Sequence, residues 1–570
     1  MSLVSVLATA AVEAPAPVTW SGDWSWLVPL PVTLPLIGAG LTLVGSRSDR
    51  FQRVVSTVVL TAVLLASIGL LVAADTLGPR VVQAGGWPAP MGVTLIVDRL
   101  AAVMVLISVI VTAGVMAYSI GQGRSSDDET DGEAPMPIFH PTLMVLTAGV
   151  STTFISGDLF HIYVGFEMLL VASFVLLTLG GSEERVRAGV NYVIVNLLSS
   201  VFFLAAIAFV YTATGTVNLA QMATRIPDLP SSAAVTLSAL LMLGFAVKAA
   251  IFPMMGWLPD SYPTAPAPVT AVFAGLLTKV GVYAIIRTQT LLFTDGALDT
   301  LLMWGALFTM LFGILGAIAQ DDIKRLLSFT LISHIGYLIF GVAVDNEMAL
   351  SGAIFYVAHH IVVQTSLFLV TGLIEWRTGT TSLAELGGLA RTAPKIAILF
   401  FVPAINLAGI PPFSGFLGKV ALLQGGAQVG TPLAYLLMAG AVLTSLLTLY
   451  AVSRVWARAF WRRPVTEVPL GERTAVSAAG TGTMASAGAP SANPATDVLR
   501  VIGPERLREL QHAADRPVPR GMMIPAAALI AVSLAFTVAA GPFYGITDRA
   551  ATDLTARDPY ITAVFPDGVP

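Results

Sequence analysis

The chain has 570 residues, of which 55% are hydrophobic and only 11% are charged, and its mean hydropathy is +0.81. Soluble domains carry about a quarter charged residues, so this composition excludes a soluble protein and indicates a chain that crosses a membrane many times. The sequence contains no cysteine, which excludes disulfides, cysteine-bound zinc and iron–sulfur clusters within the chain.

Apolar stretches recur along most of the chain. Each is about 17 to 25 residues long, which fits a bilayer core about 30 Å thick. We therefore predict an all-α polytopic membrane protein with about fourteen transmembrane helices. The predicted helices begin near residues 26, 54, 99, 141, 160, 189, 233, 266, 298, 323, 348, 396, 432 and 522.

Basic residues in the connections differ strongly between the two sides of the predicted membrane. The richer side holds Arg47, Arg50, Arg53, Arg124, Arg185, Arg187, Lys324, Arg325, Arg377, Arg391, Lys395, Arg454, Arg458, Arg462 and Arg463. The poorer side holds Arg80, Arg99, Arg225 and Arg287. Because Lys and Arg accumulate in cytoplasmic loops, we expect a multi-pass protein of the bacterial cell membrane with both termini extracytoplasmic.

Composition divides the chain into five parts. Residues 1–25 form an extracytoplasmic N-terminal segment, and residues 26–460 hold predicted helices one to thirteen. Residues 464–520 contain a stretch rich in Gly, Ala, Ser and Pro, which is too poor in large side chains to build a core, so we expect a disordered cytoplasmic insert. Residues 521–545 form the fourteenth helix, and residues 546–570 an extracytoplasmic tail.

Two segments share the pattern Ile-x-Pro-x-x-Gly-aromatic-Leu. They are "IFPMMGWL" in predicted helix 7, which runs inward, and "IPPFSGFL" in predicted helix 12, which runs outward. Similar segments of opposite direction predict an inverted-topology repeat, with helices 4–8 matching helices 9–13. Proline removes a backbone donor, so Pro253, Pro411 and Pro412 predict that helices 7 and 12 are discontinuous; a simple packing kink is the alternative.

Three of the five lysines fall inside apolar segments, namely Lys248, Lys279 and Lys419. A charge at the bilayer centre costs a few kcal/mol, so such lysines need a reason to be there. Lys419 lies close enough to a helix end to reach the interface, but Lys279 lies about 18 Å from its cytoplasmic entry at 1.5 Å per residue. Glu167 is the one carboxylate deep in a segment, and we expect it to pair with Lys248.

Histidines extend this set of titratable groups. His334, His359 and His360 all lie near the middle of apolar segments. A single buried histidine is usually a hydrogen-bonding partner between helices. The three histidines, together with the lysines and Glu167, instead predict a proton relay. We expect no metal at the histidine pair, because no thiol or carboxylate is near it in sequence. No phosphate-binding loop or nucleophile motif is present, so we expect no cofactor and no enzyme activity.

Several stretches resemble one family of membrane proteins. They are "GFEMLLVASF", "VKAAIFPMMGWLPDSYPTAPAPVTAVFAGLLTKVGVY", "AIAQDDIKRLLSFTLISHIGY", "AELGGLARTAP" and "INLAGIPPFSGFLGK". These are similar to segments of the antiporter-like subunits shared by Mrp-type multisubunit cation/proton antiporters and respiratory complex I. The resemblance covers residues 26 to 460. It implies fourteen helices with inverted repeats of helices 4–8 and 9–13.

The resemblance also implies roles for individual residues. Glu167 and Lys248 match the family's glutamate–lysine pair, Lys279 its helix 8 site and Lys419 its terminal site. His334, His359 and His360 match the positions that connect these sites in the family. The family's complex I members commonly carry a lysine where this chain has Gln364, so the role of the central histidines there is open.

The details resemble the D-type subunits of Mrp antiporters most closely, because of Gln364, Lys419 and the paired histidines. The expected function is proton translocation within a multisubunit Na⁺/H⁺ antiporter in the lipid bilayer, with other subunits as partners and no role for nucleic acid. One alternative is a proton-pumping subunit of complex I or of a membrane-bound hydrogenase. Another is a structural membrane scaffold whose buried charges only pair and pack.

Overall fold

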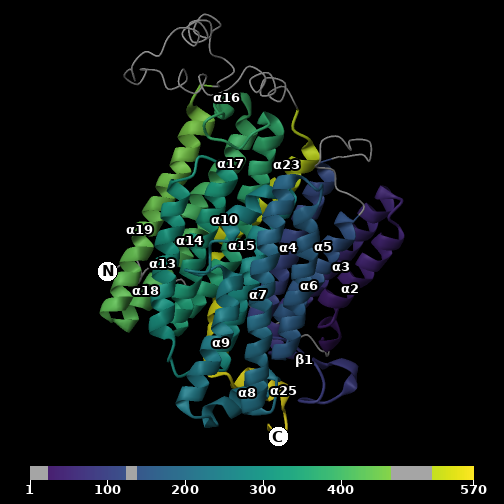
Figure 1. Ribbon diagram of the computed structural model, residues 1–570, viewed down its shortest axis with the longest axis vertical. Helices are drawn as coiled ribbons and strands as arrows, with labels where there is room; N and C mark the ends of the chain where they lie inside the picture. Colours follow the sequence, from purple (N-terminus) through teal and green to yellow (C-terminus); the bar gives the residue numbers. More distant parts are fainter. Residues whose placement is uncertain (1–23, 123–137, 464–516, 570) are drawn as a thin grey trace, which may run out of the picture.

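The computed structural model describes residues 24–122, 138–463 and 517–569. Figure 1 shows them as a bundle whose helices run mostly along the long axis of the molecule. The predicted insert lies outside the described residues as far as residue 516, and so does the N-terminal segment as far as residue 23.

Within the described ranges, twelve spans are long and apolar enough to cross a membrane, and two further apolar helices are shorter. The long spans are built from η1 (Ser25–Leu27), α2 (Leu30–Val44), α3 (Asp49–Leu77), α4 (Arg99–Gly121), α6 (Leu159–Thr178), α7 (Glu183–Thr214), α9 (Ser231–Ala249), α11 (Ala267–Val272), η6 (Phe273–Leu277), α12 (Thr278–Leu291), α13 (Asp299–Ile318), α14 (Ile323–Ala343), α15 (Glu347–Thr378), α19 (Pro432–Val455), η7 (Trp456–Trp461) and α23 (Arg520–Val538). The shorter pair are α5 (Phe139–Ile155) and α17 (Pro394–Ala408). The remaining helices are η2 (Ala84–Gly86), α8 (Leu219–Arg225), η4 (Ile226–Asp228), α10 (Leu258–Ser261), η5 (Tyr262–Thr264), α16 (Leu389–Thr392), α18 (Ser414–Val429), α24 (Ala540–Ala556) and α25 (Asp558–Val564). The prediction of an all-α polytopic membrane protein is confirmed.

Each predicted segment coincides with a helix, and most begin within a few residues of the predicted position. The largest shift is at α7, which was expected near residue 189 and begins at Glu183. Its first turn is polar, so hydropathy alone misses it. The helix starts there because the Ser182 hydroxyl accepts a hydrogen bond from the backbone N–H of Arg185 at 3.4 Å.

Both expected helix breaks are present. α9 ends at Ala249 and α10 begins at Leu258, while α17 ends at Ala408 and α18 begins at Ser414. The predicted discontinuity of helices 7 and 12 is therefore confirmed. Two further irregularities were not predicted: η6, between α11 and α12, and η7, after α19, both have the wider π-helical geometry.

Side chains satisfy the backbone groups that the breaks release. At the first break the Trp257 indole N–H donates to the main-chain oxygen of Val247 at 3.0 Å, and the N–H of Phe252 donates to the Thr309 hydroxyl at 2.9 Å. At the second break the N–H of Gly415 donates to the Asn406 amide oxygen at 2.9 Å. Protein groups thus meet the requirement that buried backbone be hydrogen-bonded inside a membrane.

The chain builds one local structure twice, at the ends of α7 and α15. The two copies are Thr214-Gly215-Thr216 and Thr378-Gly379-Thr380, and in each the first threonine hydroxyl donates to the main-chain oxygen of the second threonine, at 3.0 Å and 2.9 Å. Two residues further on, Asn218 pairs with Asp158, and Ser382 pairs with Asp322, each as an isolated antiparallel bridge. We call these two structures the clasps. In Figure 1, α8, which follows the first clasp, lies at the lower end of the bundle, and α16, which follows the second, lies at the upper end. This placement supports the inverted repeat.

The lower end carries two features that the sequence did not predict. A short hairpin pairs β1 (Arg80–Gln83) antiparallel with β2 (Thr94–Val97). The expected C-terminal tail is helical, because α24 continues to Ala556 and α25 runs to Val564. α24 and α25 bury the apolar side chains of Ala550, Ala551, Leu554 and Tyr560 against the bundle.

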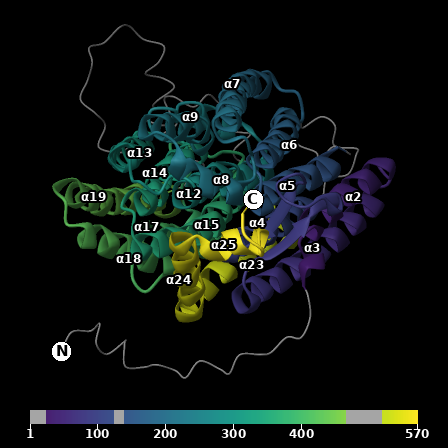
Figure 2. The ribbon, with the colours of Figure 1, turned by 90° about the horizontal axis from the view of Figure 1, so that it is seen from below.

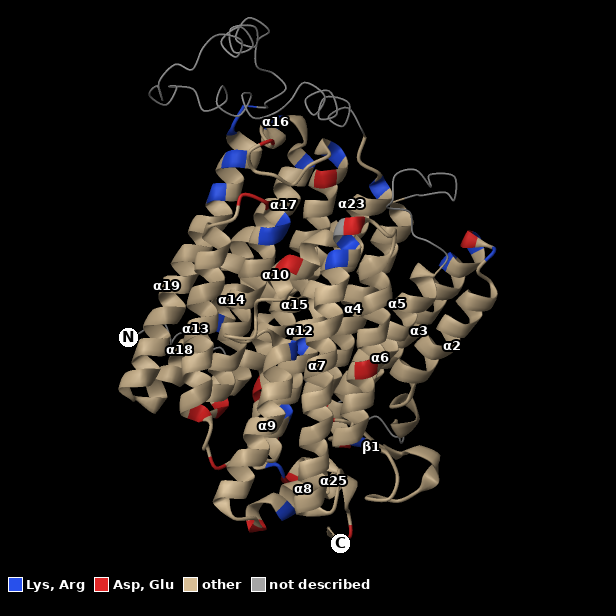
Figure 3. Cartoon of the chain, viewed as in Figure 1, with Lys and Arg blue, Asp and Glu red and all other residues tan. Residues whose placement is uncertain are grey.

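Figure 2 shows α15 near the middle of the bundle, with α2 and α3 toward one side and α18 and α19 toward the other. α15 and the span through α11, η6 and α12 are buried through their apolar middle parts. Figure 3 shows that charged residues gather toward the two ends, so the few charges in the interior stand out.

Candidate functional site

Lys248 lies in the last turn of α9, directly before the first break. The side chain is buried, and its ammonium donates hydrogen bonds to the main-chain oxygen of Asn196 at 3.3 Å and to the hydroxyl of Ser200 at 3.2 Å, both on α7. The ammonium nitrogen also lies 6.0 Å from the ring centre of Phe166 on α6. The helix end adds a favourable field, because the free carbonyls of a C-terminal turn carry partial negative charge.

Glu167, the predicted partner of Lys248, makes no hydrogen bond to it. Among the described residues no ion pair joins them, and the Oε1 atom of Glu167 is buried without a hydrogen-bond partner. Neighbouring side chains on a helix point about 100° apart, and Phe166 is the residue of α6 that lies over the lysine. The ammonium donates to α7, so in this structure Glu167 acts on Lys248 through its charge and not through a hydrogen bond, and the predicted pairing stays a prediction.

Lys279 lies in the first turn of α12, directly after η6. It is fully buried, and its ammonium donates to the main-chain oxygen of Ala274 at 2.7 Å. Ala274 belongs to η6, whose wider turn changes the register of backbone hydrogen bonds and makes a carbonyl available to the lysine. The irregular helix thus supplies the partner of this charge.

Lys419 lies in α18, beyond the second break. Its ammonium donates to the main-chain oxygens of Leu407 and Ala408, both at 3.2 Å, and lies 4.7 Å from the ring centre of Tyr337. Both carbonyls belong to the last turn of α17, the negative end of that helix. Gly409 allows the approach, because a Cβ there would lie 2.9 Å from Cδ of Lys419.

The three histidines lie on α14 and α15 and reach toward the second break. The ring centres of His334 and His360 are 5.1 Å apart, and Nδ1 of His359 lies 3.0 Å from the Ser414 hydroxyl at the start of α18. Tyr356 lies between these elements, since its ring centre is 5.3 Å from that of His359 and the Lys419 ammonium is 5.9 Å from its ring centre. The structure thus brings the three histidines and Lys419 together.

Many polar atoms in this region have no hydrogen-bond partner among the described residues. Gln364 donates to the main-chain oxygen of Leu327 at 2.8 Å, but its own side-chain oxygen accepts no bond. The other such atoms are Nε2 of His334, Nε2 of His359, both ring nitrogens of His360 and the hydroxyl of Tyr356. Buried polar atoms are normally satisfied by protein or by internal water, so this row is suited to hold water between titratable groups.

Arg287 differs from its sequence interpretation, which counted it as a loop residue. It lies inside α12, is 1% exposed, and its guanidinium donates to both carboxylate oxygens of Asp98 at 2.7 Å and 2.8 Å. Hydropathy cannot reveal such a residue, because its partner is distant in sequence and the pair has no net charge.

Sequence reasoning also missed several partners of the predicted residues. Tyr356 lies four positions before His360, a helical spacing that places both on one face and could have been noticed. Asn196 and Ser200 carried no such signal, because only the packing of α7 on α9 brings them to Lys248.

The fold and the site define a class of protein: a polytopic membrane protein whose irregular helices hold buried lysines on neutral oxygens. Among the described residues none of Lys248, Lys279 and Lys419 forms an ion pair. The chain belongs to the family described as NADH:quinone oxidoreductase/Mrp antiporter, transmembrane, which matches residues 156–448.

Individual relatives agree with this family. The D-type subunit of the Na⁺/H⁺ antiporter of Alkalihalophilus pseudofirmus is 40% identical over 438 residues, which is 76% of this chain and 87% of that protein. The corresponding D-type Na⁺/H⁺ antiporter subunit of Bacillus subtilis is 37% identical over 436 residues, 76% of this chain and 86% of that protein. Among solved structures, a chain of the Mrp complex from a Dietzia species matches with a TM-score of 0.80 and 31% identity, covering 95% of this chain and 99% of that chain. A chain of an archaeal membrane-bound sulfane sulfur reductase shares the fold, with a TM-score of 0.79 at 22% identity.

Proposed function

We propose that this chain is the proton-translocating D-type subunit of a multisubunit Na⁺/H⁺ antiporter, and thus a transporter component rather than an enzyme. Lys248, Lys279 and Lys419, held by neutral oxygens at irregular helix ends, are the observation that carries the proposal. A lysine bound in this way can release its proton without leaving a buried carboxylate unpaired. The antiporter subunits of Alkalihalophilus pseudofirmus and Bacillus subtilis support the assignment by their similarity.

In the proposed path a proton enters at Lys248 and passes to Lys279. The histidines of α14 and α15 and the amide of Gln364 then connect Lys279 to Lys419, where the proton leaves. Water bound to the unpaired ring nitrogens of His360 and to the Tyr356 hydroxyl would bridge the gaps between these groups. Glu167 tunes Lys248 electrostatically without bonding to it. Pro253, Pro411 and Pro412 keep the helices open at both ends of the path.

We further propose that the chain works in the bacterial cell membrane with both termini outside and with other antiporter subunits beside it. The excess of Lys and Arg on one side of the predicted membrane supports this orientation. Na⁺ and H⁺ are the proposed transported ions of the whole complex. No role for a cofactor, a metal or nucleic acid is needed.

The test uses everted membrane vesicles that contain all co-encoded subunits. A pH gradient is built up, Na⁺ is added, and the collapse of the gradient is compared between wild type and Lys248→Ala, with assembly checked in parallel. Lys395→Ala is the matched control, because Lys395 is an exposed lysine at the start of α17. Collapse in wild type and in Lys395→Ala, but not in assembled Lys248→Ala, supports the proposal.

Two other results would contradict it. Full activity in assembled Lys248→Ala would make that lysine a structural charge. If Na⁺ has no effect even in wild type, a redox-driven proton pump becomes the better assignment.

A further inference from the structure

One face of α12 is polar from the middle of the bundle to its lower end. Lys279, Tyr283 and Arg287 follow at intervals of four, which places them on one side of the helix about 6 Å apart along its axis. All three are buried, being no more than 1% exposed. The Tyr283 hydroxyl links the stripe to α5, because it donates to the main-chain oxygen of Phe154 at 2.6 Å, and it accepts from the Arg287 guanidinium at 3.2 Å.

The stripe ends at a paired charge. Arg287 binds both carboxylate oxygens of Asp98, and Asp98 also caps α4 by accepting from the N–H of Ala101 at 2.9 Å. Burial raises the pKa of the Asp98 carboxyl, but the charge and hydrogen bonds of Arg287 together with backbone N–H groups lower it by more, so the net pKa lies below the usual range. The pair therefore stays ionised and fixed at this end of α12.

Tyr560 of α25 covers the pair. The Arg287 guanidinium lies 4.9 Å from the ring centre of Tyr560 and 5.4 Å from that of Tyr283, so it is held between two aromatic rings. Within the described ranges the Tyr560 hydroxyl and Nε of Arg287 have no hydrogen-bond partner, although both are buried. Tyr560 therefore contacts Arg287 through its ring and not through its hydroxyl.

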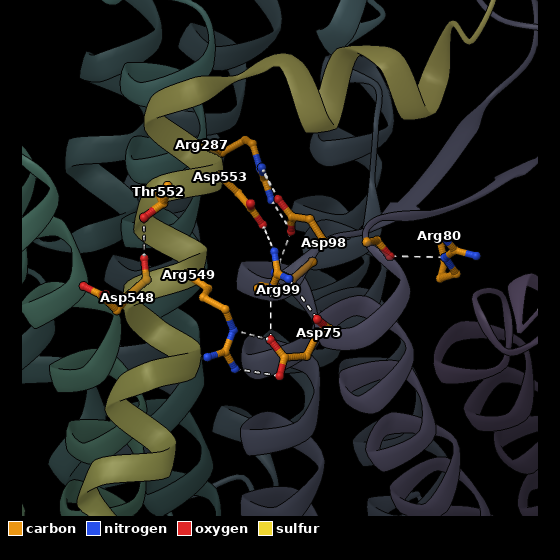
Figure 4. Close-up of polar contacts among 11 residues, drawn as sticks. Asp75, Arg80, Asp98, Arg99, Arg287, Asp548, Arg549, Thr552 and Asp553 are labelled. Carbon is orange, nitrogen blue, oxygen red and sulfur yellow. Dashed lines mark hydrogen bonds and ion pairs between the residues drawn. The ribbon is translucent and has the colours of Figure 1, made fainter. Parts of the chain in front are cut away.

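The C-terminal segment is anchored around this cover by ion pairs, which Figure 4 shows together with the Asp98–Arg287 pair. Arg549 of α24 binds the Asp75 carboxylate at 2.7 Å and 2.9 Å, and Arg99 bridges Asp75 and Asp553. Four elements, α3, α4, α24 and α25, thus converge on the end of α12.

A merely structural clamp does not account for the stripe. Moving a charge pair into a low-dielectric interior costs free energy that apolar side chains would not cost, so the pair is weak evidence of a stabilising role. A polar face that runs from a buried lysine to the end of the bundle is, however, a route along which water and protons can leak. A fixed guanidinium on such a route opposes the passage of protons by electrostatic repulsion.

We propose that the Asp98–Arg287 pair, covered by Tyr560, is a seal that isolates Lys279 from the aqueous phase at the α25 end of the bundle. The proposal rests on the proposed function in treating Lys279 as a proton site. Without the seal, water entering along the face that carries Tyr283 would let a proton on Lys279 exchange with that phase, and the proton would be lost from the relay.

The test measures passive proton leak, without Na⁺, in everted vesicles that contain the full complex. After respiration is stopped, the decay of the pH gradient is followed for wild type, Tyr560→Ala and the control Tyr544→Ala. Tyr544 lies on the same C-terminal segment but donates to the Met348 sulfur at 3.3 Å, away from the pair. We expect decay about tenfold faster in Tyr560→Ala only, which corresponds to a barrier lowered by about 1.4 kcal/mol.

A second variant shows whether the leak uses the stripe. In Tyr560→Ala combined with Lys279→Ala, the decay should return to the wild-type rate. The neutral double variant Asp98→Asn with Arg287→Gln should leak like Tyr560→Ala, and it avoids leaving one buried charge unpaired. Wild-type decay in both assembled seal variants, or a leak that persists without Lys279, would overturn the seal. Because Na⁺ is absent, these results are independent of the antiport test: a Lys279-dependent leak together with no Na⁺ response in wild type would keep the seal and reject the antiporter.

Discussion

The ammonium of Lys248 lies 3.2 Å from the hydroxyl oxygen of Ser200 on α7, whereas Glu167 lies on the neighbouring helix α6. A serine hydroxyl is a neutral acceptor, so this contact can hold the lysine in either protonation state. Ser200 is therefore the side chain that, together with the main-chain oxygen of Asn196, holds the Lys248 ammonium in place.

Ser200→Ala should slow Na⁺-driven collapse of the pH gradient by about tenfold while leaving assembly intact. Losing a hydrogen bond to a charged group costs about 1.5 to 3 kcal/mol, and the freed ammonium would shift toward Glu167. Ser199→Ala is the matched control, because the Ser199 hydroxyl donates to the main-chain oxygen of Gly244 at 3.0 Å. Equal activity of the two variants would remove Ser200 from the path.

Gly409→Ala should impair transport through Lys419. The glycine has φ of +82°, and an added Cβ would lie 2.9 Å from Cδ and 3.2 Å from Nζ of Lys419. Backbone strain alone costs about 1 to 2 kcal/mol. Gly430→Ala separates the two effects, because Gly430 has φ of +67° but nothing within 4 Å of the added Cβ. Both variants should lose similar thermal stability, measured in detergent, but only Gly409→Ala should lose antiport activity. If Gly430→Ala loses as much activity, strain rather than the lysine contact is responsible.

The sequence predicted those parts of the site that carry their own signal. Proline and charge inside apolar segments are rare, so the two breaks and the three buried lysines could be found one residue at a time. The histidines could be found in the same way, and the family resemblance supplied the order of the lysines and histidines along the path. The structure adds that the lysines at both breaks lie at the carbonyl end of a half-helix, Lys248 within α9 and Lys419 against α17.

The contacts between the site residues depend on which helix faces meet. Hydrophobic periodicity does not show which faces meet when buried helices are apolar on all sides. Glu167 and Lys248 share a membrane depth, yet the ammonium bonds to α7. Arg287 was misassigned for the same reason, since Asp98 neutralises it from the start of α4. The clasps were missed although "TGTVNLA" and "TGTTSLA" are alike, because their shared residues form polar turns and carry no hydropathy signal.

Because the two clasps have the same structure, equivalent substitutions in them should lower the free energy of unfolding by similar amounts. In Thr214→Val and in Thr378→Val one hydroxyl that bonds the following turn is lost, so each should lower the free energy of unfolding by about 1 kcal/mol. Thr212→Val is the control, since its hydroxyl only returns to the main-chain oxygen of Ala208 on an exposed face of the same helix. Thermal unfolding of the purified complex measures all three. A neutral change at one clasp and a severe change at the other would contradict equivalent structures.

Asp158, in the first clasp, should make stability depend on pH. Burial raises the pKa of its carboxyl from 3.8 to about 6, although the N–H groups of His161 and Phe160 oppose the shift. The folded chain therefore binds this proton more readily than the unfolded chain, so the contribution to stability is complete below pH 4 and is lost as pH rises through 6. The loss is at most about 3 kcal/mol.

Asp158→Asn should remove that dependence, because asparagine caps a helix about as well as aspartate and does not ionise. The melting temperature of the variant should rise relative to wild type between pH 4 and pH 7, and the two should be closest at the acid end. Unfolding of the complex in detergent, followed across that range, measures the difference. A difference that does not change with pH would mean that Asp158 titrates at its ordinary value, and that the Asp158–Asn218 bridge does not exclude water from the carboxyl.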